Sequence, residues 1–221
     1  MEVFSPLLEQ AIELAAQWHD GTYRKSRWRV PAFDLPDDTA LGVPVTAHVT
    51  AVAFTVQRAG WDDAAVAAAF LHDVLEDGNR FGQRFRRARL RQLMGDAVTL
   101  LVETVSEPRL DADGTVRPWR DRKVDYIARL REGPAAAVAI SLADKLHNLW
   151  TMNESLAQGI DIFSKGEGRR ALSAGPEAQV WFFKAVLQAS RAHADDRLAP
   201  MRARLQKELD RFIELTGQTA S

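Results

Sequence analysis

The stretch from Ala64 to Leu71 constrains the fold most, because all eight of its residues are apolar. A helix that is apolar on every side must be surrounded by other elements of the fold. His72, Asp73, Glu76 and Asp77 follow directly. At about 100° per residue, these four side chains fall on one side of a continued helix. The sequence therefore predicts a central helix that carries one imidazole and three carboxylates in a single patch.

Helix boundary signals recur along the rest of the chain, as capping residues or Pro before apolar stripes and Gly after them. The expected helices cover residues 6–18, 45–59, 62–76, 96–105, 118–131, one from 134 that contains 140–152, and 176–217, with Pro200 as the candidate point of interruption. Longer irregular segments lie at 26–42, 107–117 and 158–175. No segment alternates with a period of two between hairpin signals, so we expect an all-α fold. Without a repeat or a shift in composition, residues 1–221 predict a single domain.

Composition excludes several classes of protein and of site. With 46% hydrophobic and 27% charged residues, the chain is typical of a soluble globular protein. Its 29 basic and 30 acidic residues give a net charge of −1, which argues against a nucleic-acid or membrane partner. The absence of cysteine excludes thiolate metal ligands and cysteine nucleophiles. An acidic N-terminal segment without a long apolar run indicates a cytoplasmic protein, and the oligomeric state stays open.

Two further polar residues interrupt apolar helical stretches. His48 lies within the expected helix 45–59, and Asp144 lies within the apolar sequence AVAISLADKLHNL. Either residue alone is typical of a structural role, as a core histidine or a salt-bridge partner. Together with His72 and Asp73 they supply two imidazoles and two carboxylates, a donor set suited to Mn²⁺, Fe²⁺ or Zn²⁺. Helix bundles build metal sites from such inward-facing side chains.

The order of His48, His72-Asp73 and Asp144 resembles that of the HD phosphohydrolase superfamily. Four motifs are similar, more narrowly, to the hydrolase domain of RelA/SpoT proteins and to stand-alone small alarmone hydrolases. They are HDGTYRKS at 19–26, FLHDVLEDG at 70–78, PWRDRKVDYIARL at 118–130 and SLADKLHNL at 141–149. The resemblance covers about residues 7–190 and implies an all-α, single-domain helical bundle of the HD type. It also implies that the protein uses Mn²⁺ to remove the 3′-diphosphate from (p)ppGpp, leaving GDP or GTP and pyrophosphate.

Carried over by position, the resemblance implies three groups of functional residues. The metal ligands would be His48, His72, Asp73 and Asp144, with Mn²⁺ expected and Zn²⁺ or Fe²⁺ as alternatives. The catalytic residues would be Glu76 and Asp77, which position and activate the attacking water, and Asn148. The residues that bind the small-molecule nucleotide would be Arg24, Lys25, Arg120, Lys123 and Asn148.

Two departures from the family pattern lie beside the expected base pocket. The segment between Lys25 and His48 carries an insertion around 28–41, and Thr22 stands where many members have Gln. Guanine is the default base, and adenosine alarmones such as (p)ppApp are an alternative. Another HD nucleotide phosphohydrolase and a non-enzymatic alarmone-binding protein are further alternatives. The retained Glu76-Asp77 pair argues against both.

Overall fold

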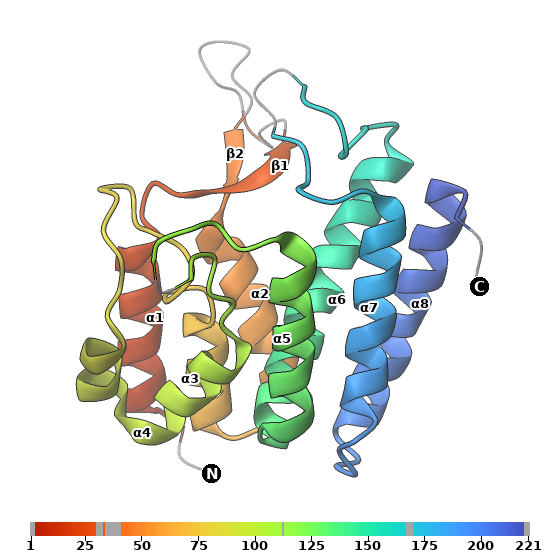
Figure 1. Cartoon of the computed structure of the whole chain (residues 1–221). Coiled ribbons are helices and arrows are strands. Elements are labelled where there is room, and N and C mark those ends of the chain that lie inside the picture. Colours follow the sequence, from red (N-terminus) through yellow and green to blue (C-terminus); the bar gives the residue numbers. More distant parts are fainter. Residues whose placement is uncertain (1–2, 30–32, 34–40, 112, 167–169, 219–221) are drawn as a thin grey trace.

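The computed structural model describes residues 3–29, 33, 41–111, 113–166 and 170–218, with backbone alone for 25–29 and 41. In chain order the elements are α1 Pro6–Trp18, β1 Tyr23–Arg29, β2 Leu41–Pro44, α2 Val45–Arg58, α3 Asp63–Leu71, α4 Arg87–Val105, α5 Trp119–Glu132, α6 Ala135–Ala157, α7 Pro176–Ser190 and α8 Leu198–Thr216. Helices dominate this part of the chain (Figure 1), which confirms the all-α class. None of the described helices is long and apolar enough to cross a membrane. The single-domain organisation stays a prediction.

The apolar helix α3 occupies the centre of the bundle, where it contacts α1, α2, α4 and α6. Its side chains from Ala65 to Leu71 are all buried. The Asp62 carboxylate begins the helix by accepting a hydrogen bond from the backbone N–H of Ala65 at 3.0 Å. The predicted central helix is therefore confirmed, together with its cap.

The end of α3 differs from the prediction, because the helix stops at Leu71 instead of continuing through Glu76. The chain then makes tight turns, in which the N–H of Glu76 donates to the carbonyl oxygen of Asp73 at 3.1 Å. Side chains from outside these turns satisfy two of their backbone carbonyl groups. Trp18 Nε1 donates to the Asp77 carbonyl at 3.0 Å, and Arg84 donates to the Glu76 carbonyl at 2.6 Å.

Two other helix boundaries also correct the prediction. Helix α4 spans Arg87–Val105 with a kink at Gly95, whose φ is 79°, so the expected helix 96–105 forms its second part and the helical part before Gly95 was not expected. Glycine adopts this positive φ without a steric penalty. The C-terminal region breaks between α7 and α8, so the expected interruption at Pro200 is wrong. Pro200 lies in the first turn of α8, where a missing N–H breaks no helical hydrogen bond.

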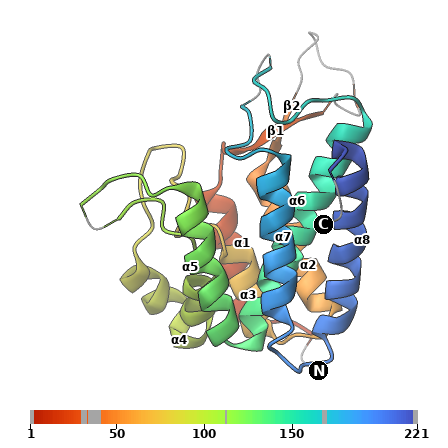
Figure 2. The same cartoon turned by 45° about the vertical axis from the view of Figure 1, so that its right-hand side comes forward.

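A short β-hairpin replaces part of the expected irregular segment 26–42. Strands β1 and β2 pair antiparallel, with Tyr23 opposite Pro44 and Trp28 opposite Gly42. An irregularity in the register between these pairs explains why the sequence shows no clean period-two pattern. In both views the hairpin and the connection from α6 to α7 lie at the same end of the bundle (Figures 1 and 2).

Candidate functional site

A pocket of about 320 Å³ is lined by residues from β1, α2, α5, α6, α7 and the turns after α3. Nine of the predicted site residues line it, namely Arg24, His48, His72, Asp73, Glu76, Asp77, Lys123, Asp144 and Asn148. The side chain of Lys25 lies outside the described residues. Arg120 is not among the lining residues. The tertiary fold thus gathers into one cavity residues that the sequence spreads over more than a hundred positions.

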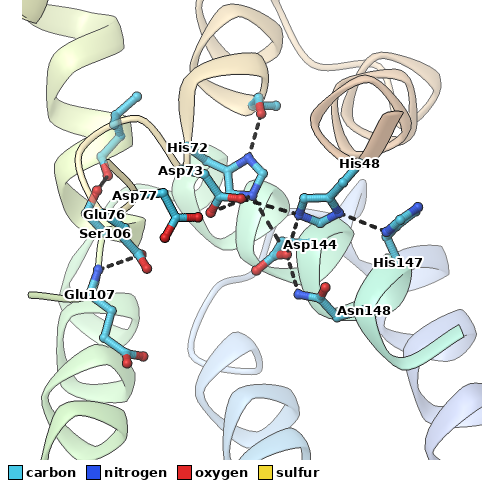
Figure 3. Close-up of polar contacts among 12 residues, drawn as sticks. His48, His72, Asp73, Glu76, Asp77, Ser106, Glu107, Asp144, His147 and Asn148 are labelled. Carbon is cyan, nitrogen blue, oxygen red and sulfur yellow. Dashed lines mark hydrogen bonds and ion pairs between the residues drawn. The ribbon is translucent and has the colours of Figure 1, made fainter. Parts of the chain in front are cut away.

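Four side chains from three segments converge inside this pocket: His48 from α2, His72 and Asp73 from the turn after α3, and Asp144 from α6 (Figure 3). Asp144 Oδ1 lies 3.2 Å from His48 Nε2 and 3.8 Å from His72 Nε2. Asp73 approaches the same two nitrogens, at 3.7 Å from His48 and 3.3 Å from His72. Donor atoms of His48, His72 and Asp144 all lie within 4.8 Å of one another.

The chemistry of His72 shows that this donor set fits a divalent cation. Its Nδ1 lies 2.7 Å from the carbonyl oxygen of Ala69 and must donate to it. In the neutral ring, Nε2 then carries a lone pair, and this buried atom makes no hydrogen bond to the described residues. A lone pair facing the carboxylates of Asp73 and Asp144 is repelled unless positive charge lies between them. Imidazole nitrogens and carboxylate oxygens are ligands suited to Mn²⁺, Fe²⁺ and Zn²⁺.

The pKa values of the two histidines are shifted in opposite directions. Burial disfavours charge on His72, yet the carboxylates of Asp73 and Asp144 outweigh it and raise its pKa to about 9. Burial lowers the pKa of His48 to about 4, and the nearby Arg24 adds to this shift. His48 is therefore neutral at physiological pH, while the surroundings of His72 favour a positive charge at its ring, which a proton or a metal ion can supply.

Two carboxylates beside the cluster are held by the segment that follows α4. Glu76 Oε1 accepts a hydrogen bond from the backbone N–H of Glu107 at 2.7 Å (Figure 3). Asp77 Oδ1 accepts from Arg109 Nη2 at 2.8 Å. Burial and the negative charge of Asp73 together raise the pKa of Glu76 to about 8. Glu76 therefore has a high proton affinity and a fixed orientation.

A chain of hydrogen bonds joins Arg24 on β1 to the cluster of His48, His72, Asp73 and Asp144. Arg24 donates to Asn148 Oδ1, and Asn148 Nδ2 donates to Asp144 Oδ1 at 2.6 Å. The other oxygen of Asp144 forms an ion pair with Lys145. Asn148 lies four residues after Asp144, so α6 presents both side chains on one face. The sequence did not predict a role for Lys145. A lysine beside an aspartate is just as often exposed, so the sequence gives no sign of this ion pair.

The wall formed by α5 and α7 is basic and aromatic. Lys123 forms an ion pair with the buried Glu107, and its Nζ lies 4.4 Å from the ring centre of Phe182. Arg120 is exposed and places its guanidinium 3.2 Å from the ring centre of Trp181. Its role in substrate binding stays a prediction. Glu107 was missed because it begins a segment that the sequence marks only as irregular.

The HD domain family model matches residues 30–164, a range that contains all four predicted metal ligands. The chain belongs to the HD domain family. This membership confirms the resemblance that the motifs indicated.

Two curated relatives show which proteins of known name the chain is similar to. The chain is 32% identical over 146 residues to a GTP pyrophosphokinase of Streptomyces coelicolor, which covers 66% of this chain and 14% of that protein. It is also 32% identical over 151 residues to the bifunctional (p)ppGpp synthase/hydrolase SpoT of Escherichia coli K12, covering 66% of this chain and 18% of that protein. The chain thus spans less than a fifth of the length of these curated relatives.

A solved structure shares the fold over nearly the whole chain. It is a metazoan ortholog of SpoT, described as hydrolysing ppGpp, and it superposes with a TM-score of 0.62 at 23% identity. The superposition covers 99% of this chain and 100% of that chain. The described helices are therefore arranged as in that structure.

Proposed function

We propose that the protein is a metal-dependent, cytoplasmic pyrophosphohydrolase that removes the 3′-diphosphate from guanosine alarmones. The observation that carries this proposal is the convergence of two histidines and two aspartates beside Glu76 in a pocket of about 320 Å³. A pocket of this size suits a small organic ligand. The curated relatives that act on (p)ppGpp support the substrate class.

We assign the metal to His48, His72, Asp73 and Asp144, and we propose Mn²⁺ as the ion. A divalent cation at such a site acts as a Lewis acid on phosphoryl oxygens and lowers the pKa of water. Lys145 occupies one oxygen of Asp144, which leaves Oδ1 directed at the two histidines. The ion pair with Lys145 thereby favours binding of the metal by one oxygen of Asp144.

We propose Glu76 as the general base. The water oxygen forms a bond to the phosphorus that is attached to the 3′ oxygen, and the bond between that phosphorus and the 3′ oxygen breaks. One water proton passes to Glu76, and the 3′ oxygen ends as a hydroxyl group after it takes up a proton. The products are GDP or GTP and pyrophosphate. A base whose pKa lies near the working pH suits this transfer, and that of Glu76 is about 8.

The basic residues of the pocket are proposed to bind the nucleotide. Arg24 has a flat guanidinium that can stack on a base, and Lys25 follows it on β1. Lys123 and Arg120 lie on one helix and are proposed phosphate contacts, while Asn148 contacts the substrate or the water. The ammonium group of Lys123 has three donors, so its ion pair with Glu107 leaves capacity for a diphosphate.

An assay with a panel of nucleotides tests the proposal. Purified protein with Mn²⁺ is incubated with ppGpp, pppGpp, ppApp and GTP, and the products are separated by anion exchange. We expect GDP and pyrophosphate from ppGpp, and no turnover of GTP. Turnover of ppApp alone would move the proposal to adenosine alarmones. Release of orthophosphate from ordinary nucleotides would replace it with another phosphohydrolase, and tight binding of ppGpp without turnover would replace it with a binding protein.

A further inference from the structure

A third histidine, His147, lies against His48 on the side of that ring opposite the carboxylates (Figure 3). The Nδ1 atoms of the two rings are 2.8 Å apart, and the ring centres are 4.7 Å apart. The other nitrogen of His48, Nε2, lies 3.2 Å from Asp144 Oδ1. Two residues of one helix therefore contact the two ring nitrogens of His48, since Asp144 and His147 both belong to α6.

This contact restricts where the His48 proton can lie. Two ring nitrogens at hydrogen-bond distance share one proton, so one ring donates and the other accepts. If His147 accepts, the His48 proton lies on Nδ1 and Nε2 keeps a lone pair for a cation. If His147 donated, the proton of a neutral His48 would lie on Nε2 instead, where it would face Asp144 and block a metal. Only the first arrangement is compatible with His48 as a ligand.

The position of His147 along α6 makes the arrangement rigid. It lies three residues after Asp144, nearly one helical turn, so the same helix carries a proposed ligand and the partner of another ligand. Its ring centre lies 6.3 Å from that of Trp150, the next residue but two. A shift of α6 would displace Asp144 and the support of His48 together.

We propose that His147 is a positioning residue of the metal centre, which accepts the Nδ1–H of His48 and thereby fixes its orientation and tautomer. The inference rests on the proposed metal site and adds a residue outside its ligand set. Partners of this kind around metal-bound histidines typically contribute a factor of about 10 to 100 in metal affinity.

Two substitutions separate the hydrogen bond from simple packing. His147→Leu introduces an apolar side chain of similar bulk and removes the Nδ1 acceptor. His147→Asn places a side-chain oxygen close to where Nδ1 stands, so the acceptor is restored. His193→Leu is a matched control, because His193 bonds the Leu130 carbonyl at 2.8 Å and does not line the pocket.

The measurement is the dissociation constant for Mn²⁺, obtained by competition with a metal-sensitive dye on the full chain. We expect His147→Leu to weaken binding about 10- to 100-fold, with His147→Asn and His193→Leu both close to the wild type. Unchanged Mn²⁺ binding in His147→Leu, or equal weakening of it in His147→Leu and His147→Asn, would overturn the role of His147 but not the proposed metal site. Failure of the wild-type chain to bind Mn²⁺ would overturn the proposed metal site itself.

Discussion

Glu76 and Glu107 are joined by a hydrogen bond of 2.7 Å, in which the backbone N–H of Glu107 donates to Oε1 of Glu76. The side chain of Glu107 is itself fixed by ion pairs with Arg122 and Lys123. One oxygen of Glu76 is therefore held by the backbone, which fixes the orientation of the carboxylate. This arrangement distinguishes Glu76 from a carboxylate on a solvated helix end.

The first prediction concerns the Glu76→Gln variant. Its amide oxygen can still accept from Glu107, but the side chain cannot accept a proton from water. We expect kcat to fall by a factor on the order of 10² to 10⁴, while metal content stays unchanged. Single-turnover release of pyrophosphate by metal-saturated protein measures the effect. Chemistry at the wild-type rate would mean that water is activated elsewhere, and loss of metal would mean that Glu76 is a ligand.

The second prediction concerns the ionisation of Glu76. Burial and the charge of Asp73 raise its pKa to about 8, and the charge of Glu107 adds to this rise, while Lys145 and the hydrogen bond from the Glu107 backbone oppose it. Since a cation stabilises the charged carboxylate, binding of Zn²⁺ should lower this pKa below 8. The ionised base should then be populated at lower pH, and the acid limb of the rate profile should shift with it.

A titration of the Glu76 side-chain carboxyl by ¹³C NMR measures the pKa directly, before and after saturation with diamagnetic Zn²⁺. Glu132, a glutamate on the exposed surface of α5, serves as an internal reference in the same spectra. A Glu76 pKa that rises or does not move when the metal binds would contradict the electrostatic account.

The convergence of the metal cluster could be predicted from the sequence because single polar residues interrupt apolar helices. His48 interrupts a helix whose other buried positions are apolar, and Asp144 lies in a mostly apolar helical stretch, so a bundle must bring both inside. The all-apolar face of α3 likewise required a central position. The helical period of the apolar residues, and the polar residues that interrupt it, were therefore sufficient to predict that these side chains lie together.

Other parts of the site depend on contacts that no local pattern encodes. The turns after α3 are held by Trp18 and Arg84, which donate to the backbone carbonyl groups of Asp77 and Glu76. The hydrogen bond from Glu107 crosses 31 positions of sequence. The contact between His147 and His48 likewise depends on how α6 packs against α2. Such long-range partners become visible only in the tertiary structure.

The third prediction concerns removal of metal ligands. An Asp73→Ala, Asp144→Ala double variant should bind no Mn²⁺, and it should keep its helical fold because two buried negative charges are lost together. Elemental analysis and far-UV circular dichroism measure both properties. Mn²⁺ should also raise the melting temperature of the wild type, by a stabilisation of about 2.7 kcal/mol at 100 times the dissociation constant. Full metal occupancy in the double variant would refute the ligand assignment.

The fourth prediction concerns the nucleotide clamp. Arg24→Ala and Lys25→Ala should each raise KM, since both side chains are proposed to contact the bound nucleotide. A fall in kcat would follow only where the same contact tightens in the transition state. Because Arg24 also donates to Asn148, Mn²⁺ affinity is measured in parallel to separate substrate binding from metal binding. Unchanged KM and kcat in the double variant would mean that both side chains are solvated and do not contact the nucleotide.

The most direct test of the central claim is the hydrolysis of ppGpp in H₂¹⁸O by the Mn²⁺-saturated protein, with the products analysed by mass spectrometry. Attack of water on the phosphorus next to the 3′ oxygen predicts one ¹⁸O atom in pyrophosphate and none in GDP. The Asp144→Asn variant under the same conditions should release no product. Label in GDP, orthophosphate as the labelled product, or equal release by Asp144→Asn would contradict the account.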